Sequence, residues 1–254
     1  MSDDEFIDTG LFAEPEGFTP PPPPPHFAKY QRKNKTDPAE LNLRLVGKSP
    51  LWGHLLWNAG VFTADYLDKH ADELVTGKDV LELGAAAGLP SLICGINKCN
   101  RVVCTDYPDP DLISNIQHNF DHCQGLDLSK TVVKGFIWGA DAKPLMDDSE
   151  KEIQNEDKFD LVILSDLVFN HTEHLKLLKT CRDTVKKNGK CLVVFSPHRP
   201  KLLENDLEFF RTCEDFQFKA EKIDLVTWKP MFEEDDESID IRARVYSFFL
   251  VPQW

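Results

Sequence analysis

The sequence has few features of membrane, secreted or metal-binding proteins. Its apolar runs fall short of the ~18 residues that a membrane helix requires. The first ten residues are acidic and lack the basic-then-apolar order of a secretory signal. Seven cysteines are present, an odd number, with no CxxC pair and no metal-ligand spacing. These absences predict a cytoplasmic protein with reduced core thiols and no bound metal.

Basic residues are scarce, and the motifs of several enzyme classes are missing. There are 29 Lys and Arg residues against 43 Asp and Glu, which gives a formal net charge of −14. This balance argues against a nucleic-acid surface, which needs clustered basic side chains. It favours basic partners, although acidity can also serve solubility alone. No G-x-S-x-G, H-E-x-x-H or phosphate-loop lysine motif occurs, and His171 and His174 are predicted to be surface residues rather than metal ligands.

Two regions are distinguished by composition. Residues 1–40 are predicted to form an acidic, proline-rich tail, and residues 41–254 a single α/β domain. The tail contains an uninterrupted run from Pro20 to Pro25, which favours an extended, solvated helix. Phe12 and Phe18 would either dock on the domain or belong to an unattached acidic leader.

Strand and helix signals alternate along the domain, which predicts a doubly wound, mostly parallel sheet with helices on both faces. A short strand is predicted over residues 43–46. Five further strands and five helices are predicted, with strands over 79–83, 101–105, 130–137, 159–164 and 190–195 and helices over 55–72, 90–98, 112–123, 172–187 and 201–210. Residues 139–157 are predicted to be a loop. With no helix expected between them, residues 216–228 and 239–251 should form an antiparallel hairpin, joined by the acidic loop 233–237, that completes a seven-stranded sheet.

A turn of glycine and alanine follows the first strand of this sheet, in the segment VLELGAAAG over residues 80–88. Small side chains let the backbone approach a ligand closely, which makes Gly84, Ala85 and Ala86, together with Glu82 before the turn, candidate cofactor-binding residues. Glu82 precedes the turn and disfavours a phosphate, so a nucleoside with a positive charge, such as S-adenosylmethionine, is favoured. The alternative is a tight loop in an α/β core that binds nothing.

Polar and aromatic residues also end the next two strands. Asp106 lies roughly 20 residues after the turn, where a carboxylate suits the two hydroxyls of a ribose. A nicotinamide cofactor would use the same residue, and a helix-capping Asp is a further alternative. Trp138 follows the third strand, where an aromatic ring can pack on an adenine, or can simply belong to the core.

Ser165 and Asp166 lie where the fourth strand leaves the sheet, and ligands bind at the carboxyl ends of such strands. A carboxylate at this position can face both a sulfonium and an incoming amine, although Asp166 could instead cap a helix. Upstream, Trp52 and Trp57 lie close together in the sequence and would be core anchors or a lid over the ligand.

Together these residues resemble the seven-strand S-adenosylmethionine-dependent methyltransferases of class I, specifically the lysine-methyltransferase-like branch called family 16. The segment 165–169 follows the D-x-x-Y/F pattern of that branch, with Phe169 in place of the commoner tyrosine. The tail segments 10–18 and 30–33 are similar to the fungal enzymes that methylate elongation factor 1-alpha on its N-terminal glycine and adjacent lysine. That group was formerly labelled nicotinamide N-methyltransferase.

The resemblance implies a cofactor, a substrate and a set of contacts. S-adenosylmethionine would bind and leave as S-adenosylhomocysteine, with contacts from Trp57, the Gly84–Ala86 turn, Asp106, Trp138 and Ser165. Asp166 is hypothesised to orient the amine and to desolvate it or receive its proton. We expect a monomer with a protein substrate, elongation factor 1-alpha, and neither nucleic acid nor membrane as partner. The alternatives are a small-molecule, nicotinamide-type methyltransferase and a non-catalytic binding module.

Overall fold

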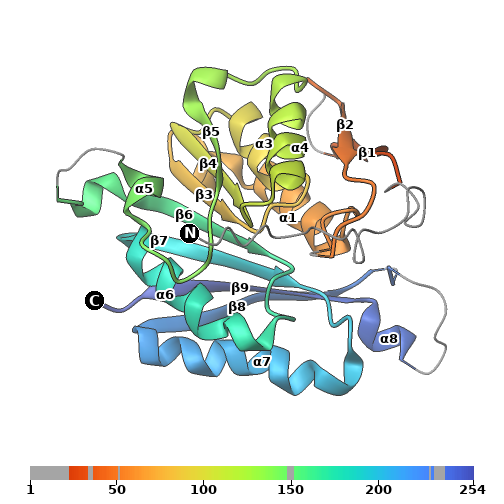
Figure 1. Cartoon of the computed structure of the whole chain (residues 1–254). Helices are drawn as coiled ribbons and strands as arrows, with labels where there is room; N and C mark the ends of the chain where they lie inside the picture. The colour runs from red at the N-terminus through yellow and green to blue at the C-terminus, as the bar shows by residue number, and fades with distance from the viewer. Residues whose placement is uncertain (1–22, 34–36, 51, 148–151, 229, 232–237) are drawn as a thin grey trace, which may run out of the picture.

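The computed structural model describes residues 23–33, 37–50, 52–147, 152–228, 230–231 and 238–254. A seven-stranded sheet forms its centre, with the strand order β5-β4-β3-β6-β7-β9-β8 (Figure 1). The strands are β3 (Asp79–Leu83), β4 (Arg101–Asp106), β5 (Thr131–Gly135), β6 (Phe159–Ser165), β7 (Val185–Phe195), β8 (Phe218–Thr227) and β9 (Arg244–Pro252). Neighbouring strands from β5 to β7 are parallel, whereas β9 is antiparallel to both β7 and β8. The predicted sheet, with its C-terminal antiparallel pair, is confirmed.

Helices cover both faces of this sheet (Figure 1). On one face lie α1 (Asn58–Lys69), α3 (Leu89–Ile96) and α4 (Pro110–Asp121), and on the other α5 (Lys143–Met146), α6 (His174–Thr184) and α7 (Leu203–Thr212). In β6, Leu161 and Ile163 pack with the first group, and Val162 and Leu164 pack with the second. Side chains alternate along a strand with a period of two, so a strand covered on both faces is apolar throughout. This is why the central strands are easily recognised in the sequence.

Several predicted segments differ from the structure, including the helix predicted over 172–187, whose last three residues belong to β7. The helix α8 (Ile239–Arg242) precedes β9, where a continuous strand is predicted, and the N–H of Ala243 donates to the Ile239 carbonyl at 2.8 Å in a helical turn. Residues 139–157 contain α5 and a 3-10 helix (Asn155–Asp157) rather than only loop, since Pro144 suits a first helical turn. The predicted helix over 55–72 ends at Lys69 and is followed by α2 (Ala71–Leu74). The predicted acidic loop 233–237 lies outside the described residues.

A separate hairpin, β1 (His26–Gln31) with β2 (Glu40–Leu45), lies beside α1 and α4 (Figure 1). Strand β2 corresponds to the predicted short strand. Strand β1 is not predicted, because it lies within residues 1–40, which the composition assigns to a tail. Phe12 and Phe18 lie outside the described residues, so their docking stays a prediction.

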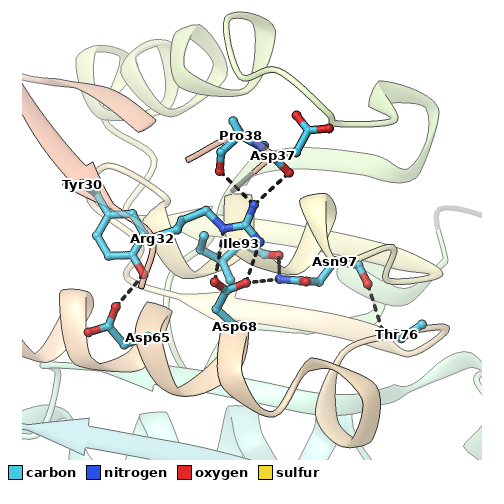
Figure 2. Close-up of polar contacts among 9 residues, drawn as sticks. All are labelled: Tyr30, Arg32, Asp37, Pro38, Asp65, Asp68, Thr76, Ile93 and Asn97. Carbon is cyan, nitrogen blue, oxygen red and sulfur yellow. Dashed lines mark hydrogen bonds and ion pairs between the residues drawn. The ribbon is translucent and has the colours of Figure 1, made fainter. Parts of the chain in front are cut away.

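A buried ion pair attaches this hairpin to the domain (Figure 2). The guanidinium of Arg32 donates to both carboxylate oxygens of Asp68 in α1, at 2.7 and 3.2 Å, and both side chains are fully buried. Its third nitrogen donates to the carbonyls of Asp37 and Pro38, each at 3.0 Å. Asn97, which follows α3, donates to the same Asp68 carboxylate at 2.8 Å. Arg32, the residue directly after β1, is thus buried against the domain.

None of the described helices is both long and apolar enough to cross a membrane.

Candidate functional site

The glycine–alanine turn lies at the carboxyl end of β3 and has the conformation that its sequence suggests. Gly84 and Ala86 have φ of +62° and +51°, in the left-handed region that favours glycine. A Cβ on Gly84 would lie 2.6 Å from Cδ2 of Leu167 and 3.2 Å from Cζ2 of Trp138. The N–H of Ala85 donates to the Thr105 carbonyl at 3.0 Å, which ties the turn to β4. The turn is therefore a closely packed cradle with Trp138 against it.

Asp106, at the end of β4, is attached to this turn. One carboxylate oxygen accepts from the N–H of Ala86 and the other from the N–H of Tyr107, each at 2.7 Å. Burial raises the pKa of Asp106, and the two N–H donors oppose that rise. A carboxylate oxygen has more than one lone pair, so Asp106 can still accept from hydroxyl groups of a ligand. The structure thus brings Gly84, Ala86, Asp106 and Trp138 together.

Glu82 does not present its carboxylate as a negative charge beside the turn. The side chain is buried, and one oxygen accepts from the N–H and hydroxyl of Ser91 at 2.9 and 2.5 Å, which anchors the first turns of α3. Burial raises the pKa of Glu82 to about 8, so the group is mostly uncharged at pH 7. The charge of Glu82 is therefore no argument for a cationic ligand, and its contact with the cofactor stays a prediction.

The buried Glu82 should make stability depend on pH. Its pKa is about 8 in the folded state and ~4.3 in an unfolded chain, so folding favours the protonated form. The stability that the protonated Glu82 contributes to the fold is fully present below the unfolded pKa and is lost as the pH rises through 8. We expect Glu82→Gln to remove this loss, because the amide oxygen can still accept from Ser91. Urea unfolding at several pH values between 5 and 9 tests this, and parallel curves for both proteins would contradict it.

Trp57 and Ser165 both lie near the N-terminal half of α1. The Ser165 hydroxyl, at the end of β6, is 3.3 Å from the Thr63 hydroxyl in α1. Trp57 immediately precedes α1 and donates its indole N–H to the Trp52 carbonyl at 3.1 Å. Trp52 is half exposed and has a φ of +64°. The two predicted residues therefore belong to one region, next to the carboxyl ends of β6 and β7.

Asp166 is buried in a strained position between the ends of β6 and β7. Its φ is +62°, its N–H donates to the Val194 carbonyl at 2.7 Å, and only 7% of the residue is exposed. One carboxylate oxygen accepts from the N–H of Ser196 at 3.2 Å, and the other lies 2.8 Å from Nε2 of His198. Leu167, the next residue, is the one that packs on Gly84. The residue after the predicted catalytic Asp166 thus contacts the cradle, whereas the Asp166 carboxylate itself binds Ser196 and His198.

Ser196 and His198 are site residues that the sequence pattern did not reveal. The His198 ring packs edge-on against Trp57 and Phe169, with ring centroids 4.7 and 6.4 Å apart. The Ser196 hydroxyl is one of three buried side-chain polar atoms without a hydrogen-bond partner in the described part of the chain, and Nδ1 of His54 is another. The sequence could still have indicated Ser196 and His198, because β6 and β7 are parallel neighbours and the residues that follow them must lie side by side.

The prediction of surface positions for His171 and His174 is wrong for His174. His174 is buried, with its Nε2 at 2.7 Å from the Val168 carbonyl. His171 is partly exposed and lies 2.6 Å from the carboxylate of Asp206 in α7. Both rings therefore hold the segment after β6 against α6 and α7. Within the described ranges, no group of three or more His, Cys, Asp or Glu side chains is arranged as a metal site.

These features fit a sulfonium nucleoside. The cradle at Gly84 has no space for a side chain, Asp106 can accept from vicinal hydroxyls, and Trp138 offers an aromatic surface beside the turn. At the carboxyl end of β6, the strand beside β3, Asp166 provides a carboxylate, and the buried Ser196 hydroxyl has an unused hydrogen-bonding capacity. The residues present thus match the cofactor that the sequence suggests.

Comparison with known proteins agrees with this geometry. The family model described as lysine methyltransferase matches residues 35–216. The chain is 59% identical over 261 residues to the protein N-terminal and lysine N-methyltransferase EFM7 of Candida albicans, covering 100% of both chains. It is 43% identical to the protein of that name from Schizosaccharomyces pombe, covering 98% of this chain and 97% of that one.

Solved structures share the fold. A putative SAM-dependent methyltransferase from Streptococcus mutans superposes with a TM-score of 0.57 at 14% identity, covering 83% of this chain and 53% of that one. A likeness at this identity shows the fold alone, which is that of class I S-adenosylmethionine-dependent methyltransferases. At the level of sequence the chain belongs to the lysine methyltransferase family, as predicted, and it is an enzyme of that family.

Proposed function

We propose that this enzyme methylates the N-terminal glycine and the adjacent lysine of elongation factor 1-alpha, with S-adenosylmethionine as methyl donor. The relatives named as protein N-terminal and lysine methyltransferases support a protein amine as acceptor. The observation that carries the proposal is the buried Asp166 carboxylate at the carboxyl end of β6, the strand that pairs with β3 and so lies beside the turn at Gly84, since a carboxylate there can accept an N–H of an acceptor amine.

In this proposal the chain's own residues hold the cofactor without a metal. Asp106 would accept hydrogen bonds from the ribose hydroxyls, and Trp138 would pack on the adenine. The turn from Gly84 to Ala86 would let the backbone approach the cofactor closely. Trp57 and Ser165 would complete the site at the start of α1. When bound, S-adenosylmethionine supplies a methyl group on a sulfonium, which an uncharged amine nitrogen can accept.

Asp166 would act on the acceptor amine. Its carboxylate accepts an N–H of the incoming group and fixes the direction of the nitrogen, and alignment alone supplies much of the rate in such a transfer. An α-amine has a reference pKa of ~7.7–8.0 and a lysine amine ~10.4, so the α-amine loses its proton far more easily. The N-terminal glycine is therefore the chemically easier of the two acceptors.

The charge of the chain supports a basic protein partner, since 43 acidic residues exceed 29 basic ones. A monomer in the cytoplasm remains our expectation. We also propose the division into a tail over residues 1–40 and a domain over 41–254, in which β1 is the part of the tail that pairs with β2 and packs on the domain.

Labelled S-adenosylmethionine tests the choice of acceptor. We expect the purified enzyme to label a peptide that begins Gly-Lys, to label its N-acetylated form much less, and to leave nicotinamide unlabelled. Mass spectrometry of elongation factor 1-alpha from cells that lack this chain should show the N-terminal methyl groups missing. Label on nicotinamide alone would favour the small-molecule alternative, and unchanged N-terminal methylation in those cells would refute the assigned substrate.

A further inference from the structure

Asp166 and His198 form a buried pair at the ends of two adjacent parallel strands. Nε2 of His198 lies 2.8 Å from one carboxylate oxygen, and the N–H of Ser196 binds the other. The side chains of Asp166 and His198 are only 6% and 21% exposed. With Trp57 packed edge-on to the imidazole, the carboxylate is held in one orientation by Ser196 and His198, which follow β7.

The charged groups around His198 come from three parts of the fold, namely the end of β6 and the helices α7 and α8. Asp166 follows β6, and Asp206 in α7 adds a second negative charge, itself paired with His171. Arg242 in α8 opposes them. Arg199 is directed elsewhere, since it donates to the Phe169 carbonyl at 2.5 Å. Burial lowers the pKa of His198, but the charge and hydrogen bond of Asp166 and the charge of Asp206 raise it by more, so the net shift is upward.

The state of His198 decides the net charge beside the acceptor amine. With a neutral imidazole, the pair carries the −1 of Asp166, which attracts a cation. With a protonated imidazole, the pair is neutral and that attraction is lost. Because the pair is poorly exposed, solvent screens this difference less than it would on the surface.

We propose that His198 is a positioning and specificity-determining residue for the acceptor amine, which holds the Asp166 carboxylate in place and, when neutral, leaves it free to attract a cationic amine. This inference rests on the proposed function, because it assumes that the acceptor is an amine. His198 acts through Asp166 and need not touch the substrate.

A peptide with a permanent positive charge separates titration of the protein from titration of the ligand. The probe is a Gly-Lys peptide whose α-nitrogen is trimethylated, and the control is the N-acetylated peptide. We expect the wild-type enzyme to bind the probe about tenfold more weakly at pH 5.5 than at pH 8.5. Binding of the acetylated peptide should change by less than about twofold over the same range.

His198→Gln is the informative variant, because its amide can still donate to Asp166 but cannot gain a proton. Its affinity for the probe should vary less than about twofold between the two pH values, whereas His122→Gln, an exposed control on the far end of α4, should behave as wild type. A His198→Gln protein that keeps the wild-type pH dependence would overturn the proposal.

An NMR titration of the wild-type enzyme tests the same link without any variant. Binding of the trimethylated peptide must lower the pKa of His198 if protonation of His198 weakens that binding, since such coupling is reciprocal. An unchanged or raised pKa would overturn the inference while leaving the proposed function intact. If the wild-type enzyme instead labels only nicotinamide, the proposed function fails, and this inference fails with it.

Discussion

Replacing Asp166 with asparagine is expected to lower kcat on a Gly-Lys peptide by at least about a hundredfold, the usual minimum for loss of a group that handles a reacting proton. Asparagine is the appropriate substitution because Asp166 has a φ of +62° and asparagine adopts that left-handed conformation more readily than alanine does. The amide keeps the shape of the side chain and an acceptor for the Ser196 N–H, so the fold should survive. The substitution removes the negative charge and one hydrogen-bond acceptor.

The cofactor should still bind, because its predicted contacts lie on other residues. We expect the dissociation constant for S-adenosylhomocysteine, measured by calorimetry, to stay within about threefold of wild type, so that the loss appears in turnover. Asp183→Asn, at an exposed pair with Lys179 in α6, is the matched control and should be fully active. Full turnover in Asp166→Asn would show that this carboxylate does not act on the amine.

Replacing Arg32 with methionine is expected to destabilise the fold by about 3–5 kcal/mol, because it leaves the Asp68 carboxylate buried without its ionic partner. The two carbonyls that Arg32 binds, at Asp37 and Pro38, lose a donor at the same time. Urea unfolding at pH 7 measures the change in the free energy of unfolding.

Two further variants of the chain show whether the loss of stability comes from the buried charge. Lys29→Met breaks a surface pair with Glu40, in which Lys29 is 70% exposed, and should cost under about 1 kcal/mol. The double variant Arg32→Met with Asp68→Asn removes the buried charge and should recover part of the loss. If Arg32→Met cost no more than Lys29→Met, the pair would not be what holds the hairpin to the domain.

The parts of the site that could be predicted are those whose signal lies in a few consecutive residues. The turn from Gly84 to Ala86 directly follows a buried strand, and Asp106 and Asp166 each follow another, so their positions come from the order of strands alone. Phe169 and its neighbours were likewise assigned from a short pattern.

The parts that could not be predicted depend on contacts between distant segments. Arg32 meets Asp68 across 36 positions of the chain, and nothing near Arg32 marks it as buried. His198 reaches Asp166 across 32 positions, and a single histidine after a strand has no distinctive spacing. The place of Glu82 before the turn suggests a contact with the ligand. The burial that keeps its carboxyl group mostly uncharged depends on the packing of α3, which nothing near Glu82 in the sequence indicates.

The position of β9 between β7 and β8 sets an order in which the sheet can be completed. Strand β8 precedes β9 along the chain, and among the described strands it pairs only with β9, so it cannot join the sheet until residues 244–252 have been synthesised and inserted. Until then the outer edge of β7, whose end carries Ser196 and His198, has no partner strand. The Asp166 site therefore reaches its final form late, and a nascent chain that lacks β9 would have an exposed strand edge beside an incomplete site.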